Sequence, residues 1–218
     1  MVDLDIPGVF HESFLGALPE PVRCDLAASA RILHLPAGKL IYDPQLSIVA
    51  DGTLRAFVED GSGRQLTLSY LDRPRAIGVA SAAGREYPVA FQAITASTIL
   101  RLSQIRFDEI RQTHTEVGWA AAEELAHNLD DVLAEIARVA FQPVRARIAH
   151  HLLALIERGE RDAQSVHQAE LAAAVGSVRE VVGRAVGTLR DAGLVDVCQA
   201  GVTAVNEDGL RQIAGQRE

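Results

Sequence analysis

The stretch VHQAELAAAVGSVREVVGRAVGTLRDAGLVDV, residues 166–197, decides the fold of the C-terminal part of the chain. Apolar residues at helical spacing predict one helix over Gln168–Ala174 and a second over Val178–Ala192, which Gly193 ends. Gly176 permits a sharp turn between them, and the small side chain of Ala172 allows close approach. The apolar residues that can form the shared core are Leu171, Val182, Val186 and Leu189. This layout is typical of a helix-turn-helix, whose second helix enters the major groove of DNA by its N-terminal end.

The N-terminal end of the second predicted helix carries side chains that can read bases. Arg179, Glu180 and Arg184 fall within its first two turns. An arginine can donate to guanine O6 and N7, and a glutamate can accept from cytosine N4. Ser177 is suited to cap the helix and to contact a phosphate. We therefore expect Ser177, Arg179, Glu180 and Arg184 to bind DNA; the alternative is an ordinary helical hairpin with a surface salt bridge between Glu180 and Arg184.

The segments on either side complete a predicted DNA-binding domain. Two short β-type runs, Leu194–Val197 and Gly201–Val205, flank Cys198-Gln199-Ala200 and predict a wing beside the DNA backbone. Upstream, Val144–Arg158 predicts a helix and Gly159–Ser165 a polar loop.

A long helix is predicted from about Glu116 to Ala140, and Phe141-Gln142-Pro143 ends it, because proline cannot continue the hydrogen-bond ladder. We place a hinge there. The apolar residues of the helix are spaced alternately three and four apart, as in a heptad seam that pairs with the same helix of a second copy. Polar flanks such as Glu124 and Asn128 leave a narrow stripe, which favours this seam over a helix packed on its own barrel. The expected dimer-interface residues are Ala122, Leu125, Leu129, Val132, Ile136 and Val139.

The N-terminal half shows a different periodicity. Residues 11–30 predict a helical lead-in, and residues 105–112 a further helix. Between them, short β-type runs, among them Ala76–Ala80, alternate with turns such as Asp51-Gly52. Short, evenly spaced strands indicate a small barrel or sandwich. The expected fold is α+β, with an N-terminal antiparallel β-barrel as sensor domain (1–113), a dimerisation helix and hinge (114–141) and a winged helix-turn-helix (142–218).

With these elements the chain resembles the cyclic-AMP receptor protein and fumarate-nitrate-reduction regulator (CRP/FNR) family of bacterial transcription factors, over nearly its whole length. The most specific part is VGSVREVVGR, residues 175–184, which is similar to the recognition-helix motif of the nucleotide-responsive branch. The resemblance implies that Arg179, Glu180 and Arg184 read a TGTGA-like half-site in a palindromic operator. It also implies a cyclic-nucleotide-binding-like barrel, a homodimer on double-stranded DNA, and RNA polymerase as a possible further partner.

The sensor half departs from the family pattern. Cyclic-nucleotide binders carry a Gly-Glu pair and, about ten residues later, Arg-Ser/Thr-Ala, which together bind the ribose hydroxyl and the cyclic phosphate. In this chain Val79 follows Gly78, and Tyr87-Pro88 stands where Arg-Ser/Thr would. Arg85 could bind a phosphate from a shifted position. The candidate ligand-binding residues are therefore Gly78, Arg85 and Tyr87, and cyclic AMP is not the expected effector.

Other cofactors are judged by their ligands. An iron–sulfur cluster needs about four thiolates, whereas the chain has two cysteines, Cys24 and Cys198. Haem needs an axial ligand, which Cys24 or a histidine could supply, although an ordinary surface or packing role is the simpler interpretation. The histidines considered are His34, His114 and His127. No cofactor or metal is assigned, and haem or another small effector stays an open alternative.

An enzyme is the competing class. A metal-dependent β-barrel enzyme needs two or three histidines and a carboxylate inside the barrel, but there is no histidine between His34 and His114. Motifs for phosphate loops, nucleophile elbows or Cys-His pairs are absent from the sequence. We expect a regulator that is not an enzyme; a constitutive DNA binder with a degenerate, ligand-free barrel is the nearer alternative.

Composition limits the location and the partners. The chain has 218 residues, a net charge of -8 and 48% hydrophobic residues, and the first residues, MVDLDIPGVF, lack the basic start of a signal peptide. A cytoplasmic protein without a membrane partner is expected. Residues 1–141 hold 12 basic and 19 acidic residues, and residues 142–218 hold 9 and 10. The acidity therefore lies in the sensor half, and DNA affinity should depend on dimerisation and a few placed arginines rather than on general phosphate attraction.

Overall fold

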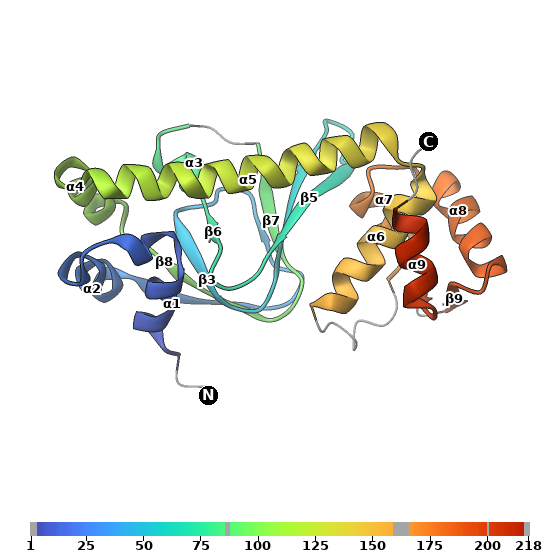
Figure 1. Cartoon of the computed structure of the whole chain (residues 1–218), viewed down its shortest axis with the longest axis horizontal. Coiled ribbons are helices and arrows are strands. Elements are labelled where there is room, and N and C mark those ends of the chain that lie inside the picture. Colours follow the sequence, from blue (N-terminus) through green and yellow to red (C-terminus); the bar gives the residue numbers. More distant parts are fainter. Residues whose placement is uncertain (1–3, 86–87, 159–165, 200, 216–218) are drawn as a thin grey trace. The chain divides into compact units, whose positions relative to one another are not determined.

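The computed structural model describes residues 4–85, 88–158, 166–199 and 201–215. The chain divides into two compact units, one of residues 1–58 and 68–132 and the other of residues 59–67 and 133–218. The long helix α5 (Thr115–Phe141) belongs to both units along its length (Figure 1).

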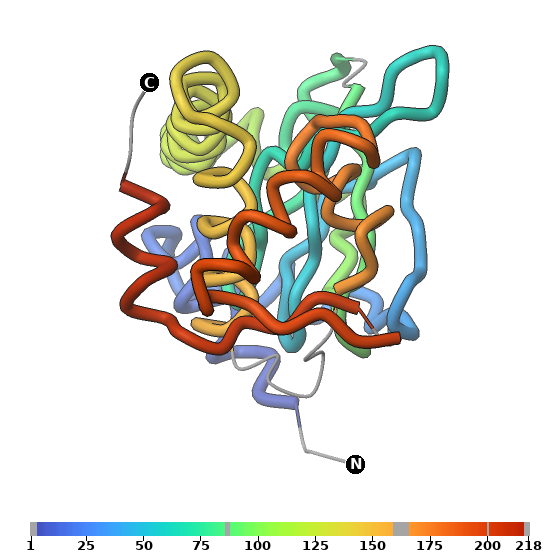
Figure 2. Tube along the Cα trace, turned by 90° about the vertical axis from the view of Figure 1, so that its right-hand side faces the viewer, coloured from blue at the N-terminus to red at the C-terminus, as the bar shows by residue number. Residues whose placement is uncertain are grey.

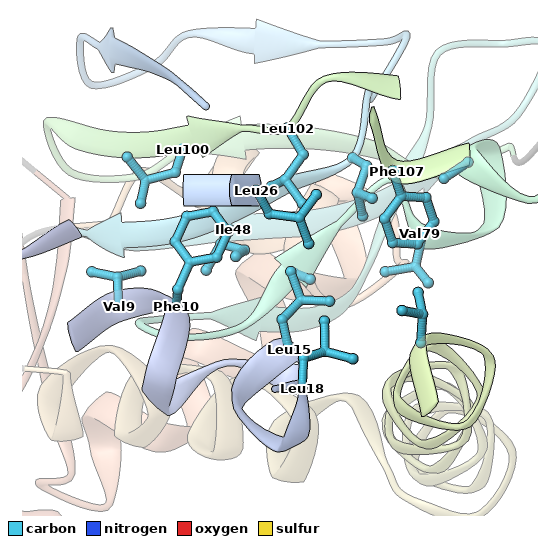
Figure 3. Packing of buried hydrophobic residues seen from close by; sticks show 14 of the residues in the cluster. Val9, Phe10, Leu15, Leu18, Leu26, Ile48, Val79, Leu100, Leu102 and Phe107 are labelled. Carbon is cyan, nitrogen blue, oxygen red and sulfur yellow. The ribbon is translucent and has the colours of Figure 1, made fainter. Parts of the chain in front are cut away.

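The first unit begins with three short helical segments, α1 (Ile6–Glu12), the 3-10 helix η1 (Phe14–Ala17) and α2 (Glu20–Ser29). The Asp5 carboxylate caps α1 by accepting a 3.0 Å bond from the Gly8 N–H. The helical lead-in predicted from residue 11 therefore begins already at Ile6. Figure 3 shows how these helices pack: apolar side chains from them converge with Ile48 of β3 and Leu100 of β8 in one buried cluster. The labelled members from this N-terminal segment are Val9, Phe10, Leu15, Leu18 and Leu26.

Two four-stranded sheets follow among the described residues, with strand orders β1-β8-β3-β6 and β2-β7-β4-β5. A second buried cluster joins them, with Val49 and Ile99 from the first sheet and Ala56 and Phe91 from the other. The strands are β1 (Arg31–Leu35), β2 (Leu40–Ile41), β3 (Ser47–Asp51), β4 (Leu54–Glu59), β5 (Gln65–Leu71), β6 (Ala76–Ile77), β7 (Ala90–Ala93) and β8 (Ser97–Arg101).

The predicted barrel is not closed, and the strand predicted over Ala76–Ala80 ends after two residues. Gly78 has φ of +75°, and a Cβ at this position would lie 2.5 Å from the Gln45 carbonyl carbon, so the backbone turns where only glycine fits. The chain then enters the short helix α3 (Val79–Ala82). β6 is the last strand of its sheet, and β2 and β5 are the outer strands of the other sheet, so the described strands form two separate sheets that pack on a shared core.

Two helices close the first unit. The helices predicted over residues 105–112 and 116–140 are confirmed as α4 (Gln104–Thr113) and α5. Ser103 caps α4. In its first half, α5 buries Val117, Ala120 and Glu124.

The second unit contains α6 (Val144–Glu157), α7 (Gln168–Ala174), α8 (Arg179–Asp191), the hairpin of β9 (Val195–Cys198) and β10 (Gly201–Ala204), and α9 (Glu207–Ala214). Its core is formed by the buried side of α6, including Ile148 and Leu152, against α8 and α9. In Figure 2, α9 (red) runs beside α6 (yellow to orange). The predicted polar loop Gly159–Ser165 lies outside the described residues.

Candidate nucleic-acid interface

The pair of helices α7 and α8 is built as the sequence predicts. Gly176 takes φ of +60° in the turn between them, the left-handed conformation that glycine adopts without strain. The Ser177 N–H donates to the Ala172 carbonyl at 3.0 Å, which closes the turn. The predicted shared core is confirmed, since each of its members is at most 1% exposed: Leu171, Val182, Val186 and Leu189.

A side chain of α6 also contacts the turn between α7 and α8. The Arg147 guanidinium donates through Nη1 to the Val175 carbonyl at 2.7 Å, and Val175 is the C-cap residue that directly follows α7. A cationic donor makes a stronger hydrogen bond than a neutral one. At the start of α7, the His167 N–H donates to the Glu170 carboxylate at 3.1 Å.

Arg179, Glu180 and Arg184 are all exposed on the N-terminal half of α8. Arg184 lies 3.8 Å from Glu180, and their side chains are 73% and 84% exposed. An ion pair this exposed contributes little to stability. The surface salt bridge of the alternative interpretation is therefore present, but it does not explain why three charged side chains gather at this end of the helix.

Ser177 does not cap α8. The N-cap residue is Val178, with extended backbone angles and no side-chain bond to the helix. Ser177 lies one residue too early, because α8 begins at Arg179 rather than at Val178. The first N–H groups of α8 thus have no side-chain cap, and uncapped N–H groups of this kind can bind an anion such as a DNA phosphate.

Two glycines on α8 were not singled out from the sequence. Gly183 and Gly187 follow Arg179 at intervals of four residues, so the three share one line along the helix. A Cβ at Gly187 would meet no atom within 4 Å, so packing does not require glycine there. Glycine within a helix costs about 1 kcal/mol relative to alanine. The signal that could have revealed this line is the four-residue spacing itself.

The two predicted β-runs form the antiparallel hairpin β9–β10, in which Val197 pairs with Val202; its place beside the DNA backbone stays a prediction. Val166, just before α7, forms an isolated bridge with Val202 on the other side. The hairpin is thereby tied to the start of the helix-turn-helix.

The predicted hinge is ordered by side-chain contacts. Gln142 donates through Nε2 to the Ala214 carbonyl of α9 at 3.2 Å.

Arg138 pairs with Glu135 at 2.7 Å near the end of α5. Burial raises the pKa of Glu135, although Arg138 opposes the rise. Burial, followed by the positive charge of Arg138, lowers the pKa of His150 on α6.

The predicted seam residues of α5 do not all share one environment. Leu129 and Ile136 are 56% and 55% exposed, whereas Val132 is half-buried against the core between the sheets. Leu133, absent from the predicted seam, is 53% exposed, and Trp119 is 74% exposed. Of the remaining predicted members, Ala122, Leu125 and Val139 are exposed to varying degrees.

The first unit, which corresponds to the predicted sensor domain and is called the sensor unit below, has a cavity of about 40 Å³. Gly78 lines it, but Arg85 is exposed and is not among its lining residues, and Tyr87 lies outside the described residues. Val79, which stands where a ribose-binding glutamate would, is buried in the core. The lining residues are Ala56, Leu68, Ser69, Leu71, Ala76, Ile77, Gly78, Val79, Ala80, Val89, Phe91, Leu125, Asn128 and Val132.

The described lining residues do not suit a cyclic nucleotide, the ligand that binders in the resembled family take. Among the lining side chains only Ser69 and Asn128 are polar, and none is charged. Among the described lining residues a cyclic phosphate would find no cation, and an unpaired charge is costly in such a site. Within the described part of the chain, no group of three or more His, Cys, Asp or Glu residues could hold a metal ion. No described helix has both the length and the apolar character needed to cross a bilayer.

Comparison with known proteins agrees with this architecture. The profile of the Crp-like helix-turn-helix domain matches residues 146–213. The cyclic AMP receptor protein of Thermus thermophilus is 29% identical over 188 residues, which cover 84% of this chain and 87% of that protein. The cAMP-activated global transcriptional regulator CRP of Salmonella typhimurium is 25% identical over 158 residues, 69% of this chain and 75% of that protein.

A solved structure supports the same assignment. A transcriptional regulator of the CRP/FNR family from Thermus thermophilus superposes with a TM-score of 0.72 at 25% identity, covering 86% of this chain and all of that one. Together with the order of the elements, these matches show that residues 146–213 form a Crp-like helix-turn-helix domain and that most of the chain is similar to transcription regulators of the CRP/FNR family.

Proposed function

We propose that the protein is a homodimer that binds a palindromic, TGTGA-like operator. The observation that carries this proposal is the group of exposed charged side chains at the start of α8, next to uncapped helix N–H groups. Arg179 and Arg184 would donate to guanines, Glu180 would accept from a cytosine, and the helix N-terminus together with Ser177 would contact a phosphate.

Two copies are needed because one recognition helix covers only a half-site. Two α8 helices would enter successive major grooves about 34 Å apart, and pairing along α5 would bring the two copies together. We assign the seam to the exposed stripe of α5 that includes Ala122, Leu129 and Ile136 and add Leu133 and Trp119 to it. These residues keep alternating spacings of three and four when Ala126 is included, as a two-helix seam requires. Leu125, Val132 and Val139 then flank the seam.

The sensor unit is proposed not to respond to cyclic AMP. An apolar cavity without a charged lining residue supports this proposal. Two versions remain distinct: regulation by another small effector, and constitutive binding with the sensor as a scaffold. RNA polymerase is a further proposed partner of the DNA-bound dimer.

Selection of genomic fragments by the purified protein, with and without cyclic AMP, tests the proposal. We expect enrichment of two-fold sites with TGTGA-like halves, and the same sites and amounts in both arms. Enrichment of single half-sites would contradict the dimer, and enrichment only with cyclic AMP would contradict the sensor proposal.

A further inference from the structure

We propose that Arg75 is a positioning residue that fixes the middle of α5 to the sensor unit through protein groups alone, so that the seam stripe faces outward without an effector. The inference rests on the proposed use of α5 as the dimer seam. Arg75 lies in the turn between β5 and β6, far from α5 in sequence.

The backbone of Arg75 is anchored to the sheet β1-β8-β3-β6, called the sensor sheet below. Its carbonyl accepts from the Val49 N–H of β3 at 2.9 Å, and its N–H donates to the Asp72 carbonyl at 2.8 Å. The side chain therefore starts from a fixed point, so its contacts with α5 transmit the position of the sheet to the helix.

The guanidinium meets four side chains of α5. It donates through Nε to Glu124 at 3.3 Å and through Nη2 to Asn128 at 2.7 Å and Asp131 at 3.2 Å; its Nη1 lies 3.3 Å from Nε2 of His127. Glu124, Asn128 and Asp131 are four and three positions apart and so share one face of the helix, and His127 lies beside Asn128. Because the guanidinium is a planar fork of donors, it can hold several acceptors in one orientation.

The Arg75–Glu124 part of the network is shielded from water. The Arg75 and Glu124 side chains are 19% and 9% exposed, and Glu124 also accepts from the Ala76 N–H at 3.1 Å. Glu124 thus ties α5 both to the Arg75 side chain and to the strand backbone. Removing one member of such a pair is costly, because the other charge is left buried and unpaired.

The network adjoins the cavity. Asn128, an Arg75 partner, lines the cavity, and so do Ala76 and Gly78, which follow Arg75 in the chain. Residues of the sheets and of α5 both line the cavity, and Arg75 already connects these two parts without a ligand. We infer that the sensor holds α5 in a single register through Arg75.

The test compares Arg75→Gln with the matched control Arg73→Gln, two residues away. Arg73 pairs with Glu12 on α1, at 2.8 Å, and not with α5. We expect Arg75→Gln to speed hydrogen exchange about tenfold or more in residues 120–132 and at Ala76, the range set by one lost charged hydrogen bond. Exchange in α4 and α6 should stay the same, and Arg73→Gln should leave residues 120–132 unchanged.

The double variant Arg75→Gln/Glu124→Gln separates this role from a general loss of packing. Because the double variant loses the buried carboxylate together with its cationic partner, hydrogen exchange in its residues 120–132 should be no faster than in Arg75→Gln alone. If Arg75→Gln does not fold, Asp131→Asn, at a more exposed partner, should give a smaller increase in the same residues. Equal exchange in wild type and each folded Arg75, Glu124 or Asp131 variant would overturn the proposal.

DNA binding provides the second readout. For a duplex with two TGTGA half-sites, Arg75→Gln should weaken binding about tenfold, while binding to a random duplex stays the same because α8 is untouched. If the wild type is monomeric or ignores the two-half-site duplex, the proposed seam or operator is wrong; the exchange comparison still decides the role of Arg75. Equal operator affinity of both proteins, with a binding wild type, would overturn the positioning role.

Discussion

The guanidinium of Arg147 on α6 donates a 2.7 Å hydrogen bond to the carbonyl oxygen of Val175, which directly follows α7 and begins the turn to α8. A side chain outside the helix-turn-helix thus contacts the turn between its two helices. We predict that Arg147→Met lowers the free energy of unfolding by about 1.5–3 kcal/mol, the usual range for a hydrogen bond to a charged group. Arg145→Met, at an exposed position of the same helix, serves as control in urea unfolding. A loss as small as that of the control would show that the bond does not hold the turn.

Base reading by Arg184 is tested against Arg190, an arginine of the same helix beyond its N-terminal half. Arg184→Ala should weaken the selected operator by about 1–3 kcal/mol and leave random DNA nearly unaffected. Arg190, which pairs with Asp191 at 3.0 Å near the end of α8, should tolerate the same change. Fluorescence anisotropy at fixed salt measures both. An equal loss on random DNA would mean that Arg184 contacts phosphate only.

The seam is tested at Leu129. We predict that Leu129→Asp gives monomers in analytical ultracentrifugation, since a charge in a two-helix seam is left without water or a partner. Ala134→Asp is the matched control: Ala134 is exposed on α5 but, five residues from Leu129, lies away from the seam. A dimeric Leu129→Asp variant would move the interface elsewhere.

Cyclic AMP should leave the melting temperature unchanged. A ligand present at a hundred times its dissociation constant stabilises the folded state by about 2.7 kcal/mol, which a thermal shift assay detects readily. The apolar lining of the cavity gives the nucleotide no charged partner. A concentration-dependent rise in melting temperature would show that the sensor binds the nucleotide after all.

Acid should weaken the attachment of α1. The hydrogen bonds from Arg73, at 2.8 and 3.0 Å, hold the pKa of Glu12 below its ordinary value of 4.5. Because the folded-state pKa is lowered, the stabilisation is present above 4.5 and is lost as the pH falls through the folded-state pKa. Wild type should melt higher than Glu12→Gln near neutral pH, and the difference should shrink in acid. A difference independent of pH would mean that the ion pair does not contribute.

Local patterns predicted most of the elements. The periodicity of the sequence placed α7 at its observed bounds and α5 and α8 to within a residue or so. Turn chemistry is local as well, so the glycine between α7 and α8 was identified correctly. What sequence could not predict depends on one dihedral angle or on distant partners. Ser177 fails as a cap because the helix starts one residue later than expected, and Gly78 ends a strand that alternation alone would continue.

The register of α5 shows the second kind of limit. Alternating steps of three and four from Ala122 fit two lines of residues, one through Val132 and one through Leu133. Only the packing of Val132 on the sheets distinguishes them. Glu124 and Asn128 look like a solvated flank in the sequence, but Arg75, 49 and 53 positions away, draws them against the sensor sheet. Contacts of this range leave no periodic signal.

The carboxylate of Glu180, exposed beside Arg184 at the start of α8, has a consequence for wrong DNA sequences. On a site that offers it a cytosine amino group, the carboxylate gains a partner. On any other site the Glu180 carboxylate would lie near DNA phosphates without a donor to offset the repulsion. The carboxylate also attracts Arg184, and this attraction would compete with the hydrogen bonds from Arg184 to the bases. The recognition helix would therefore choose its operator by rejecting mismatched DNA as well as by binding the match.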